Sequence, residues 1–246
     1  MPKTDLYPFI FKRKSVRNYR NEPLPEGTID DISSFSQTIV PLFPNIKVRI
    51  DLRGSEGIKG LLRTNAPHYI LFYSEAKEGY LPNAGFMLQQ LDLFLSANGI
   101  GNCYQGLGKS KDRSDAPSGM EFVIMTSFGQ PAENQWRSDP SDFKRRPLSE
   151  ISAVNGMNDI MEAARVAPSA ANNQSWYFTG GDGNINAYYE KSVLTGRINQ
   201  INVGIALCHM AVAAEHFGKK IKFILDSAAQ KENIKGHVYV ISVKVE

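Results

Sequence analysis

The chain has 246 residues, of which 42% are hydrophobic and 22% are charged, as expected of a globular protein that buries one large core or two small ones. Its 28 Lys and Arg residues against 25 Asp and Glu residues give a net charge of +3, which is too small to indicate a nucleic-acid or membrane surface. No segment reaches the roughly 20 apolar residues that a membrane span needs. We therefore expect a soluble, cytoplasmic protein with neither nucleic acid nor membrane as a partner.

The two cysteines, Cys103 and Cys208, and the four histidines are scattered without metal-ligand spacing. This pattern predicts neither a zinc site nor a disulfide framework. We expect both thiols to be reduced.

The first half of the chain predicts two or three helices and three strands. A short basic helix or turn is expected at residues 9–19, and a capping box at Thr28 predicts a helix to about Gln37. Apolar patterns predict strands at residues 45–51, 68–73 and 122–128, and a long apolar helix at residues 83–97 that Asn98 and Gly99 end. A polar loop is expected at residues 132–147.

The second half repeats this plan. Helices are expected at residues 157–165 and 202–216, the second ending at Gly218, and strands at residues 175–178, 185–189, 220–225 and 237–245. The same number of residues separates Gly85 from Gly99 as Gly204 from Gly218, which indicates a duplication, although two buried helices can share this spacing by chance. We predict an α+β fold, with long core helices on a largely antiparallel sheet, in two repeats (residues 1–147 and 148–246) packed together as one globular unit.

A basic segment near the start, residues 11–19 (FKRKSVRNY), alternates cations around Ser15. Ammonium and guanidinium donors beside a hydroxyl suit a phosphate, which accepts several charge-assisted hydrogen bonds. The alternative is a solvated basic surface.

A second segment, residues 167–178 (APSAANNQSWYF), places many neutral hydrogen-bonding groups at one turn. Such a turn can bind the edge of a planar heterocycle through main-chain and amide groups. The alternative is a polar loop that caps the next element.

A third segment, residues 98–106 (NGIGNCYQG), follows the first long helix. Its glycines would let bare backbone lie against a ligand, or they form a helix C-cap followed by a turn. The pattern is not GxGxxG, so a Rossmann dinucleotide site is not indicated.

Together these residues resemble the FMN-dependent nitroreductase family. Its amino-terminal motif, Arg-Arg-Ser-x-Arg-x-aromatic, is matched by residues 13–19, and its Pro-Ser-Ser-x-Asn-x-Gln-Pro-Trp motif by residues 168–176. Family-like features also occur at residues 66–67, 99–104, 129–131 and 144–150. The resemblance covers most of the chain and implies a nitroreductase-like sandwich.

The order of the motifs departs from the family. In an ordinary member the Pro-Ser segment soon follows the basic motif, and two subunits exchange these segments to build two flavin sites. Here residues 37–45 occupy that position, the Pro-Ser motif lies in the second half, and the second half lacks a basic start and a Gly-x-Gly loop. The chain thus resembles a single-chain branch in which two half-repeats mimic the dimer. This implies one FMN per chain and a monomer, with a weak homodimer left open.

The resemblance implies a set of FMN contacts and neither a catalytic side chain nor a metal. The phosphate would be held by Arg13, Ser15 and Arg145; the ribityl chain and pyrimidine edge would lie along Lys14 and Arg17; backbone near the ring would come from Gly99, Ile100 and Gly101; and the other side of the ring would be lined by Pro168, Ser169, Ala170 and Asn172, with Gln174 adding an amide.

By the same resemblance, hydride passes from NADH or NADPH through FMN to a small-molecule acceptor such as a nitroaromatic or a quinone. A flavin oxidase and a reductive dehalogenase stay open, as do a non-catalytic flavin-binding or storage protein and a degenerate member that serves as a binding module. The last alternative is kept open by Ala170 and Ser175, which stand where the family has Ser and Pro.

Other side chains have a packing interpretation beside a functional one. Lys59 and Arg63 could reach the flavin pyrimidine, and Tyr104 and Trp136 could stack on a substrate. Cys103 is more simply explained as a small core residue.

Overall fold

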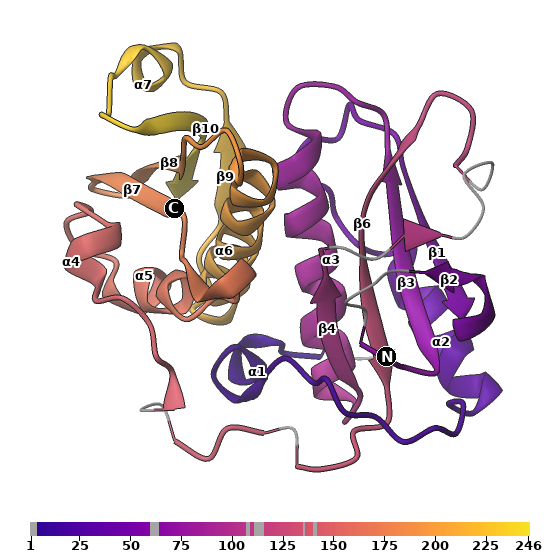
Figure 1. Cartoon of the computed structure of the whole chain (residues 1–246). Coiled ribbons are helices and arrows are strands. Elements are labelled where there is room, and N and C mark those ends of the chain that lie inside the picture. The colour runs from indigo at the N-terminus through magenta and orange to yellow at the C-terminus, as the bar shows by residue number, and fades with distance from the viewer. Residues whose placement is uncertain (1–3, 60–63, 107–108, 111–115, 135, 140–141) are drawn as a thin grey trace. The chain divides into compact units, whose positions relative to one another are not determined.

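The computed structural model describes residues 4–59, 64–106, 109–110, 116–134, 136–139 and 142–246 (Figure 1). The chain divides into two compact units. Unit 1 comprises Met1–Phe11, Leu81–Gln89 and Asp139–Glu246, and unit 2 comprises Lys12–Tyr80 and Gln90–Ser138. Each unit combines helices with an antiparallel sheet, so the predicted α+β class is confirmed. The division at residues 147 and 148 stays a prediction.

Unit 2 is built on a four-stranded antiparallel sheet. The strands β1 (Val48–Gly54), β3 (His68–Ser74), β6 (Glu121–Gly129) and β4 (Gly101–Gln105) follow one another in the order β1-β3-β6-β4. A short pair, β2 (Ile58–Lys59) with β5 (Lys109–Ser110), forms a separate two-stranded sheet. The helix α2 (Glu26–Ser36) and the second half of α3 (Tyr80–Ala97) complete the unit, and Phe35 of α2 stacks on Phe94 of α3 with ring centroids 3.9 Å apart.

The central position of β3 explains its composition. Six of its seven residues are buried, because β1 and β6 lie along its two edges and side chains pack on both of its faces. Tyr69, Leu71 and Tyr73 belong to a cluster with Ile58 and Met125. The run that predicted a strand here is therefore the core of unit 2.

Unit 1 has a second antiparallel sheet and a long buried helix. The strands β7 (Trp176–Gly181), β8 (Asn184–Glu190), β10 (His237–Val245) and β9 (Ile221–Ile224) follow the order β7-β8-β10-β9. The helix α6 (Gly196–His216) packs on β7, β8 and β9 and on the shorter α5 (Asn158–Arg165), as Figure 1 shows. The remaining elements are α1 (Tyr7–Lys12), α4 (Leu148–Ile151), α7 (Ser227–Lys231) and the 3-10 turn η4 (Ala170–Asn172).

The two sheets have the same topology. In each, two strands precede a long helix, two strands follow it, and the last strand inserts beside the second. The second and fourth strands of each sheet also have a register shift at a similar place, beside Tyr73 in one and beside Tyr239 in the other.

The two long helices end in the same way, as their sequences predicted. Gly99 and Gly218 have positive φ angles of 74° and 68°, which a residue with a side chain adopts only with strain. After each glycine the next backbone N–H bonds back into the last turn, from Ile100 to Leu95 O at 2.9 Å and from Lys219 to Ala214 O at 2.8 Å. Both are Schellman motifs.

Two other glycines allow close contact between α6 and the part of α3 that belongs to unit 1. A Cβ on Gly85 would lie 2.0 Å from Ile201 O, and a Cβ on Gly204 would lie 2.0 Å from Pro82 O. Such spacing leaves no room for a methyl group, so the two backbones touch at both positions. The contacts are reciprocal, since the residue three before each glycine meets the glycine of the other helix.

Three local predictions were wrong. The capping box at Thr28 is inside α2, which begins at Glu26 after Pro25. The glycine-bearing loop of residues 98–106 is largely the buried strand β4. The helix α6 begins at Gly196, six residues before its apolar run.

Candidate functional site

Residues 13–19 of the basic segment follow α1 as extended chain and belong to unit 2. Ser15 forms a parallel bridge with Asn102 of β4, and Val16 N donates to Asn102 O at 3.0 Å. On its other side Asn18 O accepts from Ala132 N at 3.1 Å. The segment is therefore anchored by main-chain bonds, which leaves the alternate side chains available for binding.

The side chains of the basic segment differ in their environments. Lys14 and Arg17 are exposed, and neither forms a hydrogen bond or ion pair within the described part of the chain. Ser15 is half-buried, and its Oγ accepts from Arg13 Nη2 at 3.3 Å. Lys14 and Arg17 therefore present their donors to solvent, on either side of a serine that the fold holds in place.

Arg13 is buried, with only 3% of its surface exposed. Its Nε lies 2.7 Å from Asp92 Oδ2 on α3, although the N–H points too far from the oxygen to count as a hydrogen bond. Its carbonyl oxygen accepts from the Arg137 guanidinium. The sequence interpretation of Arg13 as a phosphate ligand did not foresee this buried ion pair.

The segment Gly99-Ile100-Gly101 has a structural explanation inside unit 2. Gly99 ends α3, and Ile100 is buried. A Cβ on Gly101 would lie 2.8 Å from three carbon atoms of Val16. Gly101 is needed because the basic segment approaches β4 so closely; a contact of these glycines with a flavin stays a prediction.

Cys103 follows in β4 and is buried. Burial raises the pKa of its thiol, and the nearby Arg17 and Arg13 oppose this shift only in part. A thiol with a raised pKa is a poor nucleophile at neutral pH. This agrees with its interpretation as a small core residue.

The second predicted segment, Pro168–Gln174, forms a strained turn in unit 1, called the amide turn below. Ala171, Asn172 and Gln174 have positive φ angles of 51°, 57° and 48°. Residues other than glycine adopt this region at a cost of about 1 kcal/mol or more each, so strain of this kind is kept where surrounding contacts enforce it. Pro168 is buried, whereas Ala170, Ala171 and Asn172 are exposed.

Gln174 holds the amide turn from inside. Its side chain is fully buried; Nε2 donates to Arg165 O at 3.0 Å, and Oε1 accepts from Arg146 N at 2.6 Å. Its backbone N–H donates to Ser169 Oγ at 2.9 Å. The Gln174 amide, which the sequence analysis assigned to a ligand, is thus hydrogen-bonded to the main chain instead.

Arg145 joins the amide turn. Its guanidinium donates to Asn172 Oδ1 and, through Nη2, to Val166 O at 3.2 Å. Asn172 Nδ2 in turn donates to Lys144 O at 2.5 Å. Of the predicted phosphate ligands, Arg145 belongs to unit 1 with the amide turn, whereas Arg13 and Ser15 belong to unit 2.

Two asparagines of α6 support the amide turn from behind, and sequence analysis missed both. Asn202 accepts from Ala170 N at 3.1 Å and donates to Asn173 Oδ1 at 3.2 Å and to Ser175 Oγ at 2.9 Å. Asn199 accepts from Asn173 Nδ2 at 3.4 Å. Both asparagines are 1% exposed. Two buried amides three residues apart in an apolar helix were the available signal.

The remaining predicted side chains have ordinary positions. Lys59 is exposed on β2, and Arg63 lies outside the described residues. Tyr104 is half-buried on β4 opposite Thr126, and the half-buried Trp136 bridges to Arg13.

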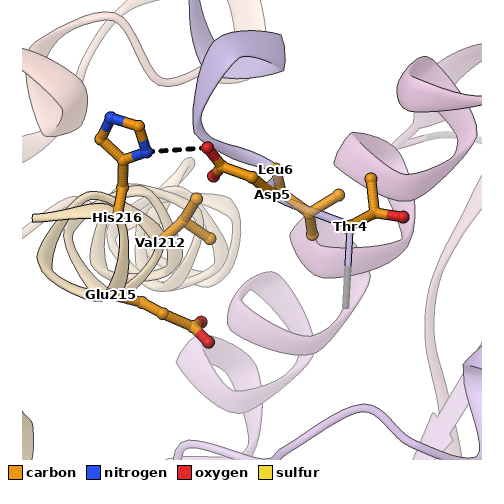
Figure 2. A pocket seen from close by; sticks show the side chains of 6 residues that line it. All are labelled: Thr4, Asp5, Leu6, Val212, Glu215 and His216. Atoms are coloured by element: carbon orange, nitrogen blue, oxygen red, sulfur yellow. Dashed lines mark hydrogen bonds and ion pairs between the residues drawn. The ribbon is translucent and has the colours of Figure 1, made fainter. Parts of the chain in front are cut away.

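A cavity of about 270 Å³ in unit 1 is separate from these residues. It is lined by Thr4, Asp5, Leu6, Val212, Glu215 and His216. Figure 2 shows His216 at the end of α6 bonded to Asp5, with Nδ1 and Oδ2 2.8 Å apart. None of the predicted site residues lines it.

Within the described residues, none of the helices combines the length and the apolar character that crossing a membrane requires. The same residues contain no group of three or more His, Cys, Asp or Glu side chains placed to hold a metal ion.

The fold and the two motif segments define a nitroreductase-like α+β protein. A family model described as "Putative TM nitroreductase" matches residues 5–214. The chain belongs to this family, which confirms the resemblance to nitroreductases drawn from the sequence; the single-chain branch stays a prediction. No match was found among curated proteins.

The chain is similar to several solved structures, and the first of those below supports the fold. A putative nitroreductase from Thermotoga maritima is 22% identical, with a TM-score of 0.66 over 98% of this chain and 94% of that chain. A nitroreductase family protein from Clostridium difficile 630 is 13% identical, with a TM-score of 0.47 over 60% of this chain and 96% of that chain. An FMN-dependent nitroreductase from Clostridium difficile R20291 is 17% identical, with a TM-score of 0.42 over 55% of this chain and 93% of that chain.

Proposed function

We propose that this nitroreductase family member is an FMN-dependent oxidoreductase that takes hydride from NADH or NADPH and reduces a small acceptor such as a nitroaromatic or a quinone. One observation carries the proposal. Arg145 and Asn172, both chosen as FMN contacts from the sequence, are 27 residues apart and hydrogen-bonded to each other. Two residues that the sequence assigned to the same ligand thus contact each other in the fold.

The basic segment suits the phosphate of FMN. The Arg13 guanidinium lies against the Ser15 hydroxyl, with Nη2 3.3 Å from Oγ, and both groups can donate to an anion. A phosphate accepts short, charge-assisted hydrogen bonds from such donors. The anchoring of this segment to Asn102 reduces the entropy that phosphate binding would otherwise cost. We propose that Arg13 and Ser15 bind the phosphate end of the cofactor, and that Lys14 and Arg17 lie along its ribityl chain and pyrimidine edge.

The amide turn suits the flat ring of FMN. Ala170 and Ala171 have short side chains and are exposed, so a planar ligand can approach the backbone closely. Hydrogen bonds that Asn202 and Gln174 accept and that Arg145 donates fix the turn before any ligand arrives. We propose that Pro168, Ser169, Ala170 and Asn172 line the ring, while Gln174 acts by holding the turn.

FMN, when bound, supplies the hydride chemistry, and the protein contributes binding, orientation and electrostatics. Arg17 and Lys14 place positive charge where a reduced, anionic flavin would be stabilised. No side chain has to act as an acid or a base, because the acceptor can take its proton from water.

The first experiment tests binding and chemistry separately. Purified protein is titrated with FMN, and reduced nicotinamide is then added without oxygen. The proposal predicts about one FMN per chain and loss of the oxidised flavin spectrum. Bound flavin that reduced nicotinamide does not bleach would favour a flavin-binding or storage protein, and absence of binding would favour a binding module.

We further propose that the two halves are tandem repeats that mimic a family dimer, so that a single chain is the working unit. The identical strand order of the two sheets and the reciprocal contacts of Gly85 and Gly204 support this proposal, because exchange of equivalent contacts is typical of a two-fold interface. Light scattering after size exclusion should give the mass of one chain, 27.4 kDa; twice that mass would contradict the monomer.

A further inference from the structure

Asp92 is a buried acid whose side chain contacts the predicted phosphate-binding segment. It is 2% exposed, on the part of α3 that belongs to unit 2. Its Oδ2 lies 2.7 Å from Arg13 Nε, and its Oδ1 accepts from Asn102 Nδ2 at 2.9 Å. A buried carboxylate is expensive unless such partners compensate for lost water, and here both oxygens have one.

Each partner of Asp92 leads to Ser15. Arg13 Nη2 donates to Ser15 Oγ at 3.3 Å. Asn102 is paired with Ser15 in the parallel bridge, and its carbonyl accepts from Val16 N. Asp92 therefore fixes the Arg13 side chain on one oxygen and the strand that anchors Ser15 on the other.

The contact of Asp92 with Arg13 occupies only one edge of the guanidinium. An arginine carries five N–H donors in a rigid fork, and Asp92 lies at Nε. Nη2, beside Nε, already reaches the Ser15 hydroxyl. An anion at this place could accept from both Arg13 and Ser15 while Asp92 stays at Nε.

The other long helix offers a comparison. When Gly85 and Gly99 are aligned with Gly204 and Gly218, Ala211 stands opposite Asp92. The acid is thus present in the helix beside the basic segment and absent from its counterpart, where no basic segment precedes. If the acid were needed only to stabilise a long helix of this fold, the counterpart helix would be expected to carry an acid as well.

We propose that Asp92 is a positioning residue for phosphate recognition: it orients Arg13 and, through Asn102, Ser15, so that both donors meet the phosphate of FMN. This inference rests on the proposed function. It predicts that Asp92 makes the protein prefer FMN over riboflavin. Riboflavin has the same ring and ribityl chain and no phosphate, so it reports on the ring contacts alone.

The test compares the dissociation constants of FMN and riboflavin by flavin fluorescence for the unmodified protein and Asp92→Asn. Hydrogen bonds to charged groups are worth about 1.5–3 kcal/mol, so the FMN constant should rise roughly 10- to 100-fold. The riboflavin constant should change less than about twofold. Asp51→Asn is the matched control: Asp51 also pairs with arginine, Arg49 at 2.6 Å, but belongs to β1 at the far edge of the sheet from β4.

Retention of the preference for FMN in Asp92→Asn, tighter FMN binding, or an equal loss of both flavins would overturn the inference. If the unmodified protein bound neither flavin, the proposed function would fail and the inference with it; if it preferred FMN and Asp92→Asn kept that preference, only the inference would fail.

A second comparison is used in case Asp92→Asn does not fold because Arg13 has lost its charged partner. Arg13→Gln alone should lose the preference for FMN, and Arg13→Gln with Asp92→Asn, which buries no unpaired charge, should lose no more. A further loss in the double variant would show that Asp92 does not act through Arg13.

Discussion

The contact between α3 and α6 predicts a large penalty for a single methyl group. In Gly85→Ala the new Cβ would lie 2.0 Å from Ile201 O, and the neighbour is backbone that cannot rotate away. The helices would have to separate by roughly 1.5 Å to restore an ordinary van der Waals distance. Overpacking of this kind costs about 1–3 kcal/mol and sometimes more, so we expect a loss of about 3 kcal/mol in the free energy of unfolding.

Urea denaturation followed by circular dichroism measures this loss, and the chain provides a matched control. Gly27 in α2 is exposed and has no atom within 4 Å of an added Cβ; alanine there should stabilise by about 0.5–1 kcal/mol through helix propensity. Gly204→Ala should resemble Gly85→Ala, and the double variant should lose less than the sum, because one helix separation relieves both clashes. A Gly85→Ala protein as stable as Gly27→Ala would refute the reasoning.

Two further predictions concern the amide turn and a histidine. Asn202→Ala removes two hydrogen bonds to the turn and one to Ser175 next to it, so it should weaken FMN binding roughly tenfold or more. Gln200→Ala, which loses a contact within α6, should not weaken binding, and equal titration curves for the two variants would count against a role of the turn in FMN binding. Burial lowers the pKa of His68, whose Nε2 accepts from Leu24 N at 2.9 Å, so folding favours the neutral ring. The stability due to His68 is therefore complete above its ordinary pKa and falls as pH drops through that value toward the lower folded one. Urea denaturation at several pH values should show this fall in the unmodified protein and a weaker one in His68→Gln; parallel profiles would contradict it.

The elements that the sequence predicted well are those whose signal is local. The apolar helix before Gly99 and the apolar run of β6 are dominated by burial, and a glycine with positive φ marks each long helix end. Periodicity and end signals are sufficient there. The family resemblance depends likewise on two short segments that keep their spacing.

The missed features depend on partners far away in the chain. β4 looked like a loop because Asn102 and Gln105 are polar, and only the contacts with Asp92 and Ser127 make them suitable for burial. The roles of Asn202 and Asp92 are equally invisible, because their partners lie 10 to 79 residues away in other elements of the fold. Local propensity cannot identify such pairs.

The central claim is that the chain binds FMN and passes electrons through it. The measurement that tests it most directly is an anaerobic spectrum of the purified protein, first with FMN and then with reduced nicotinamide. The account predicts that about one FMN per chain remains with the protein after gel filtration and that its oxidised absorbance disappears on reduction. A protein that emerges colourless after incubation with excess FMN would contradict the account.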